Sequence, residues 1–277
     1  MSGLGKTHLN AIHNALRERS GVVNFTAAWQ EIHRLFNLGR VERRKLRLSS
    51  EELELLRMEA KRAFGWDPIE PLGGQTRLDA AHQAIDEKLA TERPDDGFVL
   101  VKGALPAPLP ALAPGLSLRI PLSHLDLAAI EQVLVIENLD CFDAWEHYPV
   151  PIELEGCLVL YRGHGGWARG TRELLASLPN EVRVTAFPDY DPAGLSIAAS
   201  LPRADALLLP ELDQRLLEKG SHAHFARQSR QAAHLEALAL DGWQGVWEEI
   251  KRHGVSIKQQ HMLALGARLR LVPRHDA

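Results

Sequence analysis

Residues 184–195 read VTAFPDYDPAGL, an apolar run that ends in two aspartates separated by one residue and is followed by a proline. In an extended segment, residues two apart point the same way, so Asp189 and Asp191 can present their carboxylates to one point. Pro192 directly after Asp191 is typical of a helix start with the aspartate as N-cap. The stretch therefore predicts a strand, a turn and a helix, with two acidic side chains at their junction.

Two carboxylates in this position favour a bound cation. Hard oxygen ligands suit Mg²⁺ or Mn²⁺, and Mg²⁺ usually takes one or two protein carboxylates together with waters and substrate phosphates. A capping aspartate beside a turn aspartate, without a ligand, is the alternative that this stretch alone leaves open.

The pattern around this stretch predicts a C-terminal α/β domain. Short apolar runs, separated by segments of helical periodicity, begin at residues 133, 158, 182 and 206, and the spacing of about 24 residues is typical of a β-α repeat with a parallel sheet. The expected strands are Val133–Ile136, Leu158–Tyr161, Val182–Phe187 and Ala206–Leu209, and the expected helices between them are 139–147, 167–178 and 192–200.

Polar residues follow three of these runs. Glu137 ends the first, the turn RGHGG at 162–166 follows the second, and the aspartate pair follows the third. Ligands of parallel sheets bind at the carboxyl ends of the strands, so we expect these residues to meet at one edge. Arg162 and His164 could contact a phosphate there, with Gly163 allowing close approach, although a purely structural role in the turn is open for His164.

The N-terminal third predicts a small, mainly helical domain over residues 1–95. Apolar residues recur at helical spacing in 9–16 and 25–36, Ser49 with Glu52 forms a capping box for a helix ending near residue 65, and a last helix is expected at 78–90. The cluster Arg43, Arg44 and Lys45 either contacts phosphates or is a solvated charged turn. With a wing at 45–48, this region would suit a winged-helix module.

Prolines at 106, 108, 110 and 114 predict an extended loop or a linker, and we place a linker with an edge strand over residues 96–118, preceding a domain at 119–277. A strand is expected at 97–102 and an edge strand at 117–121. Past the predicted sheet, helical patterns occur at 211–219, 228–240, 243–253 and 256–265.

Composition narrows the function classes. The 277 residues carry a net charge of -4, so any polyanion must bind a local basic patch. Two cysteines are too few for a disulfide framework or a four-cysteine zinc site. We expect a cytoplasmic protein, because the sequence has neither an apolar run of about 18 residues nor a signal peptide.

Taken together, VLVIEN at 133–138, RGHGG at 162–166 and PDYDPAGL at 188–195 resemble the motifs of Toprim domains, whose fold is a Rossmann-like, mostly parallel four-stranded sheet with flanking helices. The set is more particularly similar to the Toprim domains of the topoisomerase VI A subunit and of JetD, also called MksG, the nuclease subunit of Wadjet and MksBEF systems. The resemblance covers residues 118–277, and the N-terminal third matches the preceding winged-helix part only loosely.

The resemblance implies a metal-dependent DNA endonuclease in which Glu137, Asp189 and Asp191 hold one or two Mg²⁺ or Mn²⁺ ions. In the family a C-terminal helix lies near this edge, which makes Lys258, Gln259 and Gln260 candidate phosphate contacts. The implied partners are double-stranded plasmid DNA, a condensin-like SMC and kleisin complex and a second copy of the chain in a homodimer, without a membrane.

Topoisomerase VI A subunits cut DNA through a tyrosine of the winged-helix domain, but all three tyrosines, Tyr148, Tyr161 and Tyr190, lie in the Toprim-like region. This favours hydrolysis over tyrosyl transfer. Two alternatives stay open: a non-catalytic Toprim-like subunit that binds DNA or a partner, and a nuclease for RNA or small phosphoesters.

Overall fold

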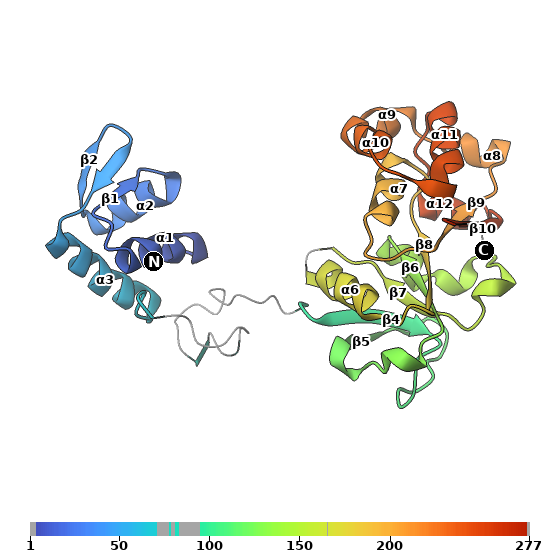
Figure 1. Ribbon diagram of the computed structural model, residues 1–277, viewed down its shortest axis with the longest axis horizontal. Coiled ribbons are helices and arrows are strands. Elements are labelled where there is room, and N and C mark those ends of the chain that lie inside the picture. The colour runs from blue at the N-terminus through green and yellow to red at the C-terminus, as the bar shows by residue number, and fades with distance from the viewer. Residues whose placement is uncertain (1–3, 71–77, 79–80, 83–94, 165, 276–277) are drawn as a thin grey trace. The chain divides into compact units, whose positions relative to one another are not determined.

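The computed structural model describes residues 4–70, 78, 81–82, 95–164 and 166–275. The chain divides into two compact units, Met1–Pro94 and Asp95–Ala277 (Figure 1). The division falls at the N-terminal end of the predicted linker. Most of the helix predicted at 78–90 lies outside the described residues.

The N-terminal unit contains three helices and a small antiparallel sheet within its described part. The capping box of Ser49 and Glu52 is confirmed, and Gly65 ends that helix in the left-handed conformation. A hairpin includes the predicted wing region, and the strand order is β1-β3-β2. The elements are α1 (Lys6–Arg17), β1 (Val22–Asn24), α2 (Ala27–Phe36), β2 (Arg40–Glu42), β3 (Lys45–Arg47) and α3 (Ser50–Phe64).

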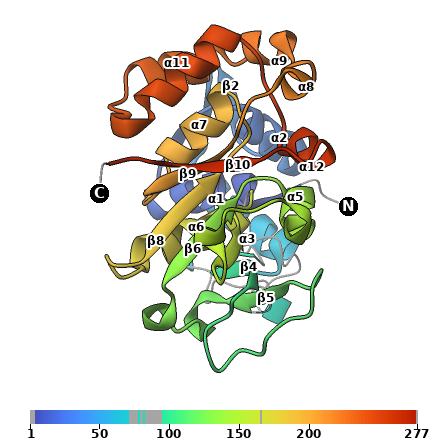
Figure 2. The ribbon, with the colours of Figure 1, turned by 90° about the vertical axis from the view of Figure 1, so that its right-hand side faces the viewer.

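The C-terminal unit is built on a mixed sheet that has seven strands among the described residues, in the order β10-β9-β8-β6-β7-β4-β5. Figure 2 shows β10 in red at one side of the sheet and β5 in green at the other. The four predicted strands are confirmed and run parallel in the centre. They are β6 (Gln132–Ile136), β7 (Leu158–Tyr161), β8 (Arg183–Phe187) and β9 (Ala206–Pro210).

Three antiparallel strands extend this centre: β4 (Phe98–Gly103), β5 (Leu118–Pro121) and β10 (Leu269–Pro273). The predicted edge strand is confirmed as β5. Of the two alternatives for the proline-rich segment, the linker between domains is wrong, because β4 pairs with β7 and buries Val99 and Val101 completely, and the extended loop is confirmed. The proline-rich segment is a loop between two strands of this sheet.

Alternating residues of the central strands face two separate cores. Leu134 and Ile136 of β6 belong to one cluster, which includes residues of α5, α7, α10 and α11, whereas Val133 and Val135 belong to the other, which includes residues of α6. Helices therefore cover both faces, which explains why the parallel strands read as continuous apolar runs.

The helices of this unit are α5 (Leu139–Asp143), α6 (Gly166–Ser177), α7 (Pro192–Ala199), α8 (Gln214–Leu217), α9 (His222–Ala226), α10 (Ser229–Glu236), α11 (Gln244–His253) and α12 (Gln259–Ala264). Short 3₁₀ helices lie at 122–124, 127–129, 145–147, 152–154 and 241–243. Both cysteines are buried and free. In the described part of the chain, every helix is too short or too polar to cross a bilayer.

Candidate functional site

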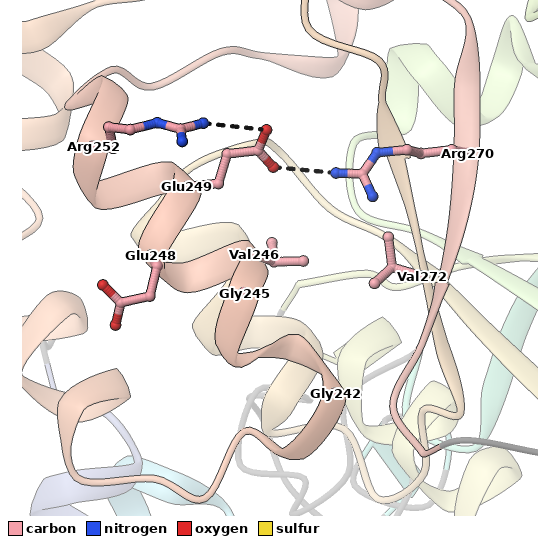
Figure 3. Close-up of a pocket in the computed structure, with 8 residues that line it drawn as sticks. All are labelled: Gly242, Gly245, Val246, Glu248, Glu249, Arg252, Arg270 and Val272. Atoms are coloured by element: carbon pink, nitrogen blue, oxygen red, sulfur yellow. Dashed lines mark hydrogen bonds and ion pairs between the residues drawn. The ribbon is translucent and has the colours of Figure 1, made fainter.

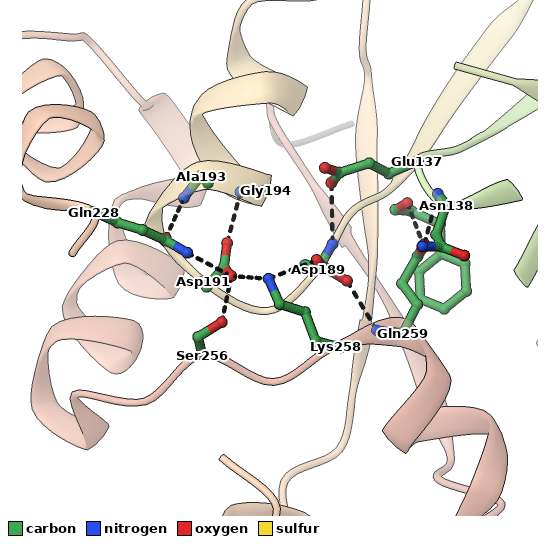
Figure 4. A network of polar contacts seen from close by, with 11 residues as sticks. Glu137, Asn138, Asp189, Asp191, Ala193, Gly194, Gln228, Ser256, Lys258 and Gln259 are labelled. Atoms are coloured by element: carbon green, nitrogen blue, oxygen red, sulfur yellow. Dashed lines mark hydrogen bonds and ion pairs between the residues drawn. The ribbon is translucent and has the colours of Figure 1, made fainter. Parts of the chain in front are cut away.

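The carboxyl ends of β6 and β8 bring Glu137 and Asp189 together. The two strands are parallel neighbours, with Ile136 opposite Phe187, and the Glu137 N–H continues the ladder by donating to the Phe187 carbonyl. The Asp189 N–H donates to Oε2 of Glu137 at 3.3 Å (Figure 4). The predicted convergence of these acidic residues at one edge is therefore present.

Asp191 is held at the first turn of α7, as its place before Pro192 predicts. Its Oδ1 accepts a hydrogen bond from the Gly194 N–H at 2.8 Å. A Cβ atom at residue 194 would overlap the backbone of Asp189, so only glycine lets the helix approach the aspartate turn this closely. The helix start and the acidic turn thus form one rigid unit.

Lys258, which lies 67 residues after Asp191 in the sequence, contacts both aspartates. Tyr190 and Ile257 form an antiparallel bridge, with N–O distances of 2.9 and 3.1 Å, which places the next residue beside the aspartate pair. Lys258 Nζ lies 2.9 Å from Oδ2 of Asp189 and 2.8 Å from Oδ2 of Asp191 (Figure 4). An ammonium group therefore lies between the two carboxylates for which the sequence predicts a cation.

The Asp191 carboxylate is fully buried and hydrogen-bonded on both oxygens. Besides Lys258, its Oδ2 accepts from Ser256 Oγ at 2.5 Å and from Gln228 Nε2 at 2.9 Å. Burial raises the pKa of Asp191, but the hydrogen bonds from Gln228, Lys258 and Ser256 outweigh it, and the net pKa lies below its ordinary value. Asp191 is therefore charged, and both of its carboxylate oxygens accept hydrogen bonds.

Glu137 and Asp189 are in the opposite electrostatic situation. Burial, followed by repulsion from Asp189, raises the pKa of Glu137 to about 7, although the charge of Arg162 opposes this. Burial also raises the pKa of Asp189, and the charge of Lys258 counteracts it. Buried carboxylates with this little compensation are characteristic of functional sites.

Gln259 fixes the geometry of both strand ends, a role that sequence reasoning missed. Its side chain is fully buried. Its backbone N–H donates to Oδ1 of Asp189 at 2.9 Å, its Oε1 accepts from the Asn138 N–H at 3.0 Å, and its Nε2 donates to the Phe187 carbonyl at 2.7 Å (Figure 4). The contacts of Ser256 and Gln228 with Asp191 were missed as well.

The turn after β7 contributes Arg162 to this edge but not His164. Arg162 lines a small hollow together with Glu137, and its Nε is buried without a hydrogen-bond partner among the described residues. Gly163 has a φ of 78°, the left-handed conformation that glycine allows. His164 instead places Nδ1 3.1 Å from the Tyr161 hydroxyl oxygen. Gly165 lies outside the described residues.

The basic residues predicted to contact DNA lie in the other unit, at the hairpin of β2 and β3. Arg43, Arg44 and Lys45 are exposed, and none of them forms an ion pair with a described residue. Arg43 and Arg44 line an open hollow with Phe25, Thr26 and other residues at the start of α2. They form a cationic surface of the N-terminal unit.

An open hollow of about 590 Å³ lies between α11 and β10 but does not contain the predicted site residues (Figure 3). Its charged side chains neutralise one another, because Glu249 pairs with Arg270 at 3.1 Å and with Arg252 at 3.9 Å. The edge with unbalanced charge is therefore the stronger candidate site.

Within the part of the chain that the structure describes, no group of three or more His, Cys, Asp or Glu side chains is arranged to hold a metal ion. Lys258 occupies the space between Asp189 and Asp191 that such an arrangement would need. The donor chemistry still fits a hard cation, because Glu137 and Asp189 place carboxylate oxygens side by side at one edge of the sheet.

Residues 88–271 match the family described as a domain of unknown function, DUF7281. The chain belongs to this family. The DUF7281 region includes the whole candidate edge, from Glu137 to Gln259, whereas the basic hairpin of the N-terminal unit lies outside it. The chain matches no curated protein.

Proposed function

We propose that this protein is a DNA endonuclease that hydrolyses phosphodiester bonds with a divalent cation at the edge formed by Glu137, Asp189 and Asp191. The observation that carries the proposal is the pair of carboxyl groups of Glu137 and Asp189 at the ends of adjacent parallel strands, with Arg162 and Lys258 beside it. Oxygen ligands for a cation, next to side chains that can neutralise phosphate oxygens, are what phosphodiester hydrolysis requires.

Two features of the fold support a Toprim-type assignment. The central strands have the order β9-β8-β6-β7, and the acidic residues follow β6 and β8 as in the motifs that the sequence resembles. In the N-terminal unit, three helices and a three-stranded sheet ending in a basic hairpin support a winged-helix module.

A Mg²⁺ or Mn²⁺ ion held by Glu137 and Asp189 would neutralise charge on the phosphate and lower the pKa of an attacking water. Glu137 is either a ligand or the general base, since a carboxyl group with a pKa of about 7 exchanges protons readily near neutral pH. Arg162 and Lys258 bind phosphate oxygens. Asp191 is a positioning residue that holds Lys258 at the site.

The N-terminal hairpin supplies the sequence-independent part of DNA binding in this proposal. Arg43, Arg44 and Lys45 neutralise backbone phosphates. The molecule as a whole has a net charge of -4, so DNA binding depends on such a local group of basic residues. From the resemblance to JetD, we propose double-stranded plasmid DNA as substrate and a role as a homodimeric nuclease subunit of a condensin-like SMC complex of the Wadjet type.

One observation favours a second candidate function. Because Lys258 already bridges Asp189 and Asp191, the aspartates could serve only to hold this lysine in a non-catalytic subunit that binds DNA or a partner. In that case Glu137 would have no cation partner and no role in hydrolysis.

Cleavage of supercoiled plasmid by the purified chain in Mg²⁺ or Mn²⁺ distinguishes the two candidates. We expect nicked or linear DNA from the unaltered protein and none from Asp189→Asn. The matched control is Asp205→Asn. Asp205 lies just before β9, at the end of the sheet away from the candidate site, and an asparagine oxygen there can still accept the hydrogen bond from the Val184 N–H. Cleavage that is independent of the metal, or unchanged in Asp189→Asn, would contradict the proposed function.

A further inference from the structure

The candidate edge contains its own cation. Lys258 Nζ contacts Oδ2 of both Asp189 and Asp191 within 2.9 Å. Burial lowers the pKa of Lys258, but the hydrogen bond to Asp191 and the charge of Asp189 outweigh this and raise the pKa to about 12. The lysine therefore stays positively charged at neutral pH.

The Lys258 ammonium group and a divalent cation cannot contact the same aspartate oxygens at the same time. Oδ2 of Asp191 already accepts three hydrogen bonds, and Oδ1 of Asp189 is taken by the Gln259 N–H, which leaves Oδ2 of Asp189 to Lys258. A dication that reached this oxygen would also lie beside a like charge. Binding of the dication therefore requires Lys258 to move.

The surroundings allow such a movement without disrupting the edge. The backbone at this point is fixed, because Ile257 is bridged to Tyr190 and Gln259 is bonded to Asp189, Asn138 and Phe187. The Lys258 side chain, in contrast, is 34% exposed and has a long flexible stem.

Asp191 also keeps other donors when the lysine leaves. Gly194, Gln228 and Ser256 continue to hold its carboxylate. The loss of one ammonium contact therefore leaves the aspartate in position.

We propose that Lys258 is an internal counter-ion that competes with the divalent cation and is drawn away by a substrate phosphate, so that cation and DNA bind cooperatively. This inference rests on the proposed function. A phosphodiester oxygen arriving at the edge gives the ammonium group another anion to contact, and this frees Oδ2 of Asp189 for the dication. Because linkage is reciprocal, the bound cation must strengthen DNA binding by the same factor as DNA strengthens cation binding.

Mn²⁺ affinity of the full chain without DNA is the first test, measured by calorimetry on the unaltered protein and on Lys258→Met. We expect Mn²⁺ to bind the variant about tenfold more tightly or better, because the competing charge is gone. Lys251→Met is the matched control, since Lys251 is 33% exposed and also contacts two carboxylates, those of Glu236 and Glu248, on α10 and α11. Its Mn²⁺ affinity should equal that of the unaltered protein.

DNA affinity with and without Mn²⁺ is the second test, measured by fluorescence anisotropy of a labelled duplex. In the unaltered protein and in Lys251→Met, Mn²⁺ should tighten DNA binding by a factor in the range of about 5 to 150 that is typical of coupled sites. In Lys258→Met this factor should fall towards one. Lys258→Gln, which keeps a hydrogen-bond donor but no charge, should behave like Lys258→Met and provides a second variant if the first folds poorly.

The outcomes separate the inference from the proposed function. Mn²⁺ binding of equal strength in the unaltered protein and Lys258→Met would overturn the inference and leave the proposed function standing. Weaker binding in the variant would also overturn it, because Lys258 would then support the cation site. If neither protein binds Mn²⁺ at millimolar concentration, both the inference and the proposed function are wrong.

Discussion

Lys102 and Lys258 both contact carboxylates below the surface of the C-terminal unit, but their charge balance differs. Lys102 of β4 is only 1% exposed and donates to the carbonyls of Phe142 and Asp143 and to the Glu146 carboxylate. One ammonium group thus meets one carboxylate and the carbonyl oxygens at the end of α5. The charge of the buried Lys102 is thus balanced by one carboxylate, that of Glu146, which lies at the surface.

Lys258 meets two carboxylates, with Glu137 as a third acid nearby, and remains about one-third exposed. Three carboxyl groups at this edge thus face two cationic side chains, Lys258 and Arg162. We infer that the matched charge of Lys102 serves the structure of the unit, whereas the surplus of carboxyl groups around the half-buried Lys258 allows a further cation to bind.

Replacement of Lys102 should have the largest effect on stability. Lys102→Met leaves two carbonyls and Glu146 without their donor, and we expect the free energy of unfolding to fall by about 3 kcal/mol in urea denaturation. Mn²⁺ affinity should not change. The exposed Lys251→Met control should lose much less stability, and a stable Lys102→Met protein would contradict the structural role assigned to this lysine.

Replacement of Lys258 should affect stability less and in a way that metal reverses. Without divalent cations, Lys258→Met leaves Asp189 and Asp191 facing each other, and we expect a loss of about 1–2 kcal/mol after allowing for solvent screening. Millimolar Mn²⁺ should restore the melting temperature of this variant but not that of Lys102→Met. Equal responses of the two variants to Mn²⁺ would contradict the different roles assigned to Lys102 and Lys258.

The pH dependence of stability should reveal the excess acid directly. The folded-state pKa of Glu137, about 7, exceeds its ordinary value of 4.5, so the folded protein binds this proton more tightly than the unfolded chain. Between these two values, the contribution of Glu137 to stability decreases as pH rises, and the decrease is complete above pH 7. In EDTA, Glu137→Gln should remove this slope from melting temperatures measured between pH 5 and 8, whereas Asp205→Asn should keep it. An unchanged slope in Glu137→Gln would show that this carboxyl group is not the source.

The basic hairpin should give the smallest effect, because each exposed arginine contributes one phosphate contact. We expect Arg43→Ala and Arg44→Ala each to weaken DNA binding a few-fold and to lower the slope of log affinity against log salt by about one. Arg62→Ala, which removes an exposed arginine paired with Glu59 on α3, is the matched control. An identical salt slope in all three variants would show that the hairpin is not part of the DNA-binding surface.

The centre of the fold could be predicted from the sequence because β6 to β9 are covered on both faces. Such strands read as continuous apolar runs, and the acidic residues that end them stand out. Two antiparallel strands were harder to place. The segment LRLVP of β10 is short, and only its pairing with β9, which no local pattern shows, makes it a strand. For β4 the strand was predicted, but not its place beside β7.

The chemical character of the site could be predicted only in part. Glu137 and Asp189 could be placed together, because the ends of parallel strands meet at one edge. The contacts that complete the site join residues far apart in the chain: Lys258 is 67 residues from Asp191, and Gln228 is 37 residues from it. The Lys258 contact depends on the bridge between Tyr190 and Ile257, and no local periodicity encodes that bridge.

A crystal of the full chain grown with millimolar Mn²⁺ tests the central claim most directly, through the anomalous signal of the metal. We expect an anomalous peak about 2.1 Å from carboxylate oxygens of Glu137 and Asp189, with Lys258 Nζ displaced from Asp189. Absence of a peak at this edge, with Lys258 still bridging Asp189 and Asp191, would contradict it.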